Sequence, residues 1–111
     1  MSVNTTALSG HLADNAVLRM TKSGTPVLNF TVAVNESVKQ DDGTYADRPS
    51  FIDCVLFGKR AAALEHQLGR GALVMVQGKL RQSTYEDKQG VKRSKVEVIV
   101  DELEWRQPFN A

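Results

Sequence analysis

Residues 51–57 alternate between two kinds of side chain, and this alternation constrains the fold more than any other feature of the chain. Successive residues of a β-strand point to opposite faces of the sheet. One face carries Ile52, Cys54 and Leu56, and the other carries Phe51, Asp53, Val55 and Phe57. Because a buried face should exclude a carboxylate, we expect the first set to lie in a core and the second to face solvent or a ligand.

This assignment leaves Phe51 and Phe57 as exposed rings about 20 Å apart along one surface, since a strand rises roughly 3.3 Å per residue. Separate flat partners could stack on two rings at that spacing. Unpaired nucleic-acid bases are such partners, because every base has a π-face. The alternative is an apolar patch that another element or subunit covers, and the segment alone leaves both interpretations open.

The net charge of +1 hides an uneven distribution of charged residues. Residues 1–58, 59–95 and 96–111 carry net charges of −2, +6 and −3, respectively. A concentrated basic block is the electrostatic footprint that phosphate binding requires. A solvated surface with uneven residue usage is the other interpretation.

Length and composition predict one compact domain in the cytoplasm. A chain of 111 residues can build one real core but is too short for two. It shows no apolar stretch long enough for a membrane span and no signal-peptide pattern. Cys54 is the only cysteine, so no internal disulfide can form, and its position in the alternation places it in the core.

Alternating patterns predict five strands and one short helix. The predicted strands are residues 3–21 with an interruption near Asp14, 26–36 with Leu28, Phe30, Val32 and Val34 on the core face, 50–57, 72–81 with Val74, Val76, Gly78 and Leu80 on one face, and a last strand with Val96, Val98 and Val100 opposite Glu97 and Asp101. The short helix is predicted over residues 59–68, with Ala61, Leu64 and Leu68 facing the core.

Turn signals at Asp42-Gly43 and Gln89-Gly90 predict two long hairpin arms, the first over residues 36–50. An all-β chain of five strands, with one helix between the third and fourth, has the layout of an OB-fold barrel, which commonly binds oligonucleotides. An SH3-like barrel and an α+β sandwich remain alternatives, and the position of the helix favours the OB-fold.

Aromatic and basic residues are interleaved along this layout. Phe51, Phe57 and Tyr85 are the candidate stacking rings, and Tyr45 is a weaker one beside Lys39 and Arg48. Candidate phosphate contacts are Lys59 and Arg60 at the start of the helix, Lys79 and Arg81 on the fourth strand, and Lys92 and Arg93 on the second arm. Stacking rings in a basic groove would bind single strands without reading sequence.

The sequence gives little support for an enzyme. His11 and His66 lie near no residue in a nucleophile or metal-ligand spacing. We find no Gly-rich phosphate loop, Cys/His cluster or paired carboxylates. We therefore expect a binding protein without a catalytic site, a cofactor or a metal.

Four segments resemble the bacterial single-stranded DNA-binding proteins: VLNFTVAV at 27–34, VLFGK at 55–59, VQGKLR at 76–81, and the hairpin at 85–100. The resemblance covers about residues 3–105. It implies an OB-fold that assembles as a homotetramer, a dimer of dimers, and coats single-stranded DNA in replication, recombination and repair. A nucleoid-associated cytoplasmic protein is the corresponding expectation. The family's stacking positions match Phe51, Phe57 and Tyr85, and its phosphate-contacting positions match Arg19, Lys59, Arg70, Arg81 and Arg93.

Three departures from the family pattern qualify these expectations. Val38 stands where the family has a stacking tryptophan, and Asp53 stands where a basic residue is common. The sequence ends without the acidic tail that recruits replication and repair enzymes, so we expect a binding domain at 1–106, a short remnant at 107–111 and no tail-mediated partners. A tailless relative of the primosomal replication-restart proteins, which bridge partner proteins on DNA as dimers, is the alternative function.

Overall fold

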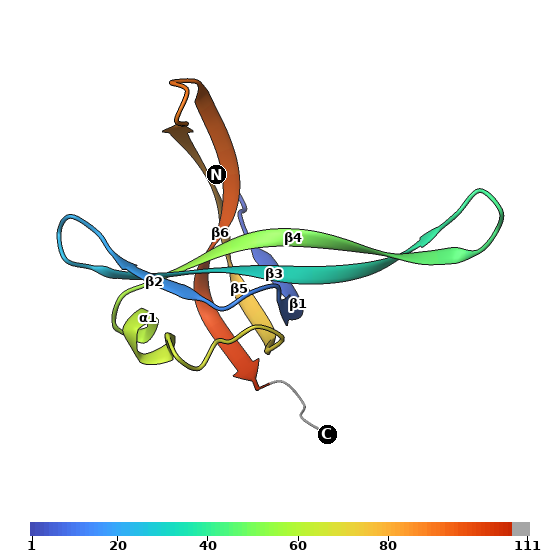
Figure 1. The fold of residues 1–111 in the computed structure, drawn as a ribbon, viewed down its shortest axis with the longest axis horizontal. Helices are drawn as coiled ribbons and strands as arrows, with labels where there is room; N and C mark the ends of the chain where they lie inside the picture. Colours follow the sequence, from blue (N-terminus) through green and yellow to red (C-terminus); the bar gives the residue numbers. More distant parts are fainter. Residues whose placement is uncertain (108–111) are drawn as a thin grey trace.

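A computed structural model describes residues 1–107, which form six strands and one helix (Figure 1). The elements are β1 (Thr6–Leu12), β2 (Val17–Met20), β3 (Pro26–Lys39), β4 (Tyr45–Phe57), α1 (Lys59–Leu64), β5 (Leu73–Glu86) and β6 (Lys92–Arg106). The interrupted first strand of the prediction is thus two strands, β1 and β2. Of the expected remnant at 107–111, residues 108–111 lie outside the described residues.

The sheet closes into a barrel because β1 pairs with a strand on each side. The strand order is β1-β5-β6-β4-β3-β2, and β1 additionally pairs with β3. One pairing is parallel, between β4 and β6, and its register joins Cys54 to Val98 and Val55 to Ile99. Strands β1, β5, β6, β4 and β3 thus form a closed five-stranded barrel, and β2 extends the sheet beyond β3. This barrel, with one short helix, confirms the predicted OB-fold.

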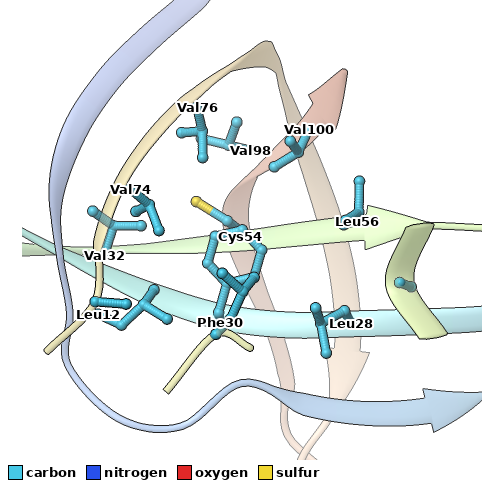
Figure 2. Close-up of a cluster of buried hydrophobic side chains, with 13 residues drawn as sticks. Leu12, Leu28, Phe30, Val32, Cys54, Leu56, Val74, Val76, Val98 and Val100 are labelled. Atoms are coloured by element: carbon cyan, nitrogen blue, oxygen red, sulfur yellow. The ribbon is translucent and has the colours of Figure 1, made fainter. Parts of the chain in front are cut away.

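The core fills the barrel with the residues that the alternation assigned to it (Figure 2). Each of the four central strands β3, β4, β5 and β6 contributes a short apolar row. The rows are Leu28, Phe30 and Val32; Cys54 and Leu56; Val74 and Val76; and Val98 and Val100, and all are at most 5% exposed. Burying an aliphatic or aromatic side chain stabilises the fold by about 1.5–3 kcal/mol. The predicted inward faces of β3 and β4 are therefore confirmed.

Helix α1 is shorter than predicted, because it ends at Leu64 instead of continuing to residue 68. Gly58, at φ 97, turns the chain out of β4 into the helix. Ala61 and Leu68 are nevertheless buried and Leu64 is half-buried, as the spacing predicted. The carbonyl of Leu68 accepts a hydrogen bond from the N–H of Ala16, at 2.9 Å. This contact ties the end of the helical segment to the loop between β1 and β2.

Two two-stranded arms leave the barrel in different directions (Figure 1). Strands β3 and β4 stay paired from Val27 and Phe57 to Lys39 and Tyr45, so the predicted first arm is a continuous β-ribbon. Strands β5 and β6 stay paired as far as Glu86 and Lys92 and form the second arm. Both predicted hairpin tips are confirmed, with Gly43 and Gly90 at positive φ in the turns.

The predicted exposure or burial of three apolar residues is wrong. Val55 was expected to face outward but is only 2% exposed, because β3 and β6 flank it on both sides. Leu80 and Val96 were grouped with core residues but are 46% and 56% exposed. Both lie where β5 and β6 leave the barrel, so their inward side has little core to pack against.

A register shift at Gly78 generates a stability prediction. Pairing steps from Gln77–Glu102 to Gly78–Val100, which leaves Asp101 as the extra residue of a β-bulge. A Cβ on Gly78 would collide with the backbone of Ile99. We expect Gly78→Ala to lower the free energy of unfolding by about 1–3 kcal/mol, as overpacking does, measured by urea denaturation. The matched control is Gly69→Ala, whose Cβ would meet only Asn15 Oδ1, at 3.5 Å. Equal stability of the two variants would contradict the prediction.

The buried thiol of Cys54 generates a second prediction. Burial raises its pKa to about 12 from 9.0, with smaller contributions from the carboxylates of Asp53 and Glu97. Because the thiolate is the reactive form, we expect Ellman's reagent to label the folded protein only as fast as it unfolds. In the unfolded chain the thiol ionises at a lower pH than in the folded protein. The contribution of the buried thiol to the free energy of unfolding is therefore complete below pH 9 and is lost as pH rises from 9 toward 12.

The control for this prediction is Cys54→Val, which fills a similar volume without a titrating group. We expect the free energy of unfolding to fall more steeply above pH 9 in the natural protein than in this variant. Rapid labelling under native conditions, or identical pH profiles, would show that the thiol is not sealed in the core.

Candidate nucleic-acid interface

The outer face of β4 continues onto β6 and β5. Because Val55 pairs with Ile99 and Glu97 pairs with Arg81, the outward residues of the three strands share one surface. The predicted stacking rings Phe51, Phe57 and Tyr85 belong to it and are 62%, 37% and 50% exposed. The structure thus brings these three rings onto one face, whereas Tyr45, at 67%, lies near the tip of the other arm.

A compact network surrounds Phe57. The Arg81 guanidinium carbon lies 5.5 Å from the centre of the Phe57 ring, within the range of a cation–π contact. An Arg81 nitrogen lies 3.5 Å from Glu97 Oε1, and Lys95 Nζ lies 3.6 Å from Glu97 Oε2. The ring, two cations and one carboxylate therefore form a single cluster on the outer face.

Glu97 contradicts its predicted place on the solvent face, since it is only 6% exposed. Its cross-strand partner is Arg81, and Lys95 lies two residues earlier on the same face of β6. The long stems of both cations can cover the carboxylate while their charged ends stay in solvent. A carboxylate can be buried here because two cations compensate its charge.

A cleft of about 440 Å³ lies beside this cluster. It is lined on its polar side by Asp14, Asn15, Arg19, Asn29, Thr31, Asp53, Lys95 and Glu97. Thr31 Oγ1 donates a hydrogen bond to Asp53 Oδ1 at 2.9 Å, which fixes the carboxylate that lies between the two phenylalanines along β4. Arg19 and Lys95 supply the positive charge, so the cleft mixes both signs.

The second arm holds Arg93 beside Tyr85. Tyr85 and Arg93 are cross-strand partners, and Arg93 Nε donates to Asp87 Oδ2 at 3.1 Å. Asp87 also accepts hydrogen bonds from the backbone N–H groups of Val91 and Gln89. The bond from Val91, followed by that from Arg93, lowers the pKa of Asp87. The carboxylate therefore organises the turn and orients a predicted phosphate contact.

The remaining predicted cations are exposed but scattered. Arg60 donates to the carbonyl of Asp101 at 2.6 Å, which ties it to the bulge of β6. Arg70 lies in the loop after the helix, where its backbone N–H donates to Asn15 Oδ1 at 2.8 Å. Arg19, Lys59, Lys79 and Lys92 are also exposed. Lys79 shares the outer face with Arg81, and Arg19 lines the cleft.

Sequence reasoning missed Glu97 as part of this site, as well as Asn29 and Thr31 on the floor of the cleft. The signal for Glu97 lay in the hairpin register, because counting back from the turn at Gly90 pairs residue 81 with residue 97. Asn29 and Thr31 reach the cleft because they lie on the face of β3 opposite Leu28, Phe30 and Val32, and they pair with Val55 and Asp53 of β4. The alternation along β3 was the signal for this placement.

Residues 1–107 show no group of three or more His, Cys, Asp or Glu side chains that could hold a metal ion. The same residues include no helix long and apolar enough to span a membrane.

Comparison with known proteins places this chain in a family. The model of the "Single-strand binding protein family" matches residues 3–105. The chain is 41% identical over 103 residues to the single-stranded DNA-binding protein of Borreliella burgdorferi, an alignment that covers 92% of this chain and 68% of the relative. It is 35% identical over 109 residues to single-stranded DNA-binding protein 1 of Staphylococcus aureus strain Mu50, covering 98% and 69%.

The single-stranded DNA-binding protein of Aquifex aeolicus is 35% identical over 101 residues, which covers 91% of this chain and 68% of the relative. These matches confirm the resemblance to the single-stranded DNA-binding proteins over about residues 3–105. The chain belongs to the single-strand binding protein family.

Proposed function

We propose that this protein binds single-stranded DNA without reading its sequence. The observation that carries the proposal is the exposure of Phe51, Phe57 and Tyr85 on one outer face that also bears Arg81, Lys95 and Arg93. Exposed rings next to cations suit a strand whose bases are free to stack and whose phosphates need neutralising. The names of the related proteins support the same ligand.

Stacking and charge have separate roles in the proposed mechanism. Bases stack on Phe51, Phe57 and Tyr85, with Tyr45 as a further ring on the first arm, and each stack stabilises the complex by about 1–3 kcal/mol. The proposed phosphate contacts are Arg19, Lys59, Arg60, Arg70, Lys79, Arg81, Lys92 and Arg93. Since Asp53 lies between the two phenylalanines, phosphates avoid that position and follow the cations around it.

The wider role that we propose is protection of single strands during replication, recombination and repair, in the cytoplasm and associated with the nucleoid. We propose a binding protein that needs no cofactor and catalyses no reaction. We also propose a homotetramer. Leu73 and Met75 line a groove with Trp105 that shares no residue with the cleft beside Phe57, and they give that assembly an apolar surface to bury.

The first test removes the stacking rings. We expect Phe51→Ala and Phe57→Ala each to weaken binding of oligo(dT) by about 1–3 kcal/mol, measured by fluorescence anisotropy. Phe51 is 62% exposed, so its removal should change thermal unfolding little, whereas removal of Phe57, at 37%, should lower stability modestly. Duplex DNA should bind poorly to every variant because its bases are already stacked.

Val96→Ala is the matched control, since Val96 is also exposed but lies on the opposite face of β6 from Glu97. Its affinity should equal that of the natural protein. Unchanged affinity combined with lost stability in the phenylalanine variants would mean that the rings belong to the core instead of the interface.

The second test measures assembly and footprint together. We expect light scattering to report a tetramer, and titration with poly(dT) to saturate at tens of nucleotides per tetramer, in line with several nucleotides per OB-fold. A dimer with a short footprint would instead support the bridging function of the primosomal proteins. A monomer that binds no poly(dT) at low salt would overturn the proposed function.

A further inference from the structure

Glu97 is the one charged residue that is buried among residues 1–107. It lies beneath the face proposed to bind DNA, where a negative charge opposes the ligand. The side chains of Arg81 and Lys95 that face it are 49% and 47% exposed. Transferring a carboxylate from water into the protein costs free energy unless cations compensate its charge. The presence of Glu97 here therefore needs an explanation beyond packing.

The contacts of Glu97 are long for ion pairs. Its two oxygens lie 3.5 Å from Arg81 and 3.6 Å from Lys95, whereas charge-assisted hydrogen bonds are typically about 2.7–2.9 Å. Neither cation is therefore locked onto the carboxylate, and each keeps an exposed side toward solvent. A phosphate arriving from outside can share both cations with Glu97.

Arg81 connects this charge balance to the stacking site. Its guanidinium lies over the Phe57 ring, so a nucleotide stacked near Phe57 would place its backbone close to Arg81. Lys95 and Glu97 also line the neighbouring cleft. The three charged groups together present a net charge of +1 to the strand, where the two cations alone would present +2.

We propose that Glu97 is an internal counter-anion that partly neutralises Arg81 and Lys95, and so limits the affinity and salt sensitivity of this face for nucleic-acid phosphates. The inference rests on the proposed function. A carboxylate in this role competes with each phosphate for the same cations, which favours rapid release and movement of the strand. A merely structural carboxylate would hold Arg81 against Phe57, and its neutralisation would weaken binding.

The test is Glu97→Gln, which keeps the shape of the side chain and removes its charge. Binding of a fluorescent oligo(dT) is measured at several salt concentrations between about 50 and 200 mM. We expect the dissociation constant at low salt to fall roughly threefold to tenfold, as one unit charge near a phosphate implies. The plot of log affinity against log salt should steepen by about 0.7, the value for one phosphate contact of a single strand.

Glu104→Gln is the matched control, because Glu104 lies on the same strand but lines the separate groove with Leu73 and Trp105; light scattering first checks that this variant keeps the oligomeric state of the natural protein. It makes the same change in net charge and should leave the salt slope unchanged. The double variant Lys95→Gln/Glu97→Gln restores the local charge of +1 and should return the slope to that of the natural protein.

If Glu97→Gln does not fold, the double variant is compared with Lys95→Gln alone, whose local charge is zero. The double variant should then have the steeper slope, again by about 0.7. Weaker binding of Glu97→Gln with an unchanged slope would overturn the inference while leaving the proposed function intact. Absence of oligo(dT) binding by the natural protein would overturn the proposed function itself.

Discussion

The burial of one face of β4 is the constraint on which the rest of the molecule depends. Cys54 and Leu56 pack into the barrel against β3 and β6, and this commits Phe51 and Phe57 to the outside. A shift of one residue in the register would exchange the two faces and place the carboxylate of Asp53 in the core. Burial of Cys54 and Leu56 stabilises the barrel, and because β4 has only two faces, the same burial keeps the two phenylalanine rings in solvent.

Local patterns predicted most of this arrangement. The alternation in β3 and β4 identified the core residues, because each strand has one face in the barrel and period two distinguishes the faces. Glycine turn signals located both arms, and the family segments implied the topology. The four rings proposed for stacking are all exposed.

What the sequence could not predict depends on neighbours that are distant along the chain. Val55 is covered because β6 joins β4 in parallel, a pairing between residues more than forty positions apart. Glu97 is covered by Arg81 and Lys95, so its burial follows from the hairpin register instead of from its own polarity. Leu80 and Val96 keep the inward direction of the pattern but lie beyond the place where the barrel ends.

The divergence of the two arms also has a mechanical consequence (Figure 1). A polymer that lies along both arms must bend between them, and the bend must fit within a molecule whose longest dimension is 53 Å. Duplex DNA resists such bending, since its persistence length is about 50 nm, whereas an unpaired strand is far more flexible. If the ligand follows both arms, as the proposed function implies, bending stiffness favours an unpaired strand over a duplex before any individual side chain touches a base.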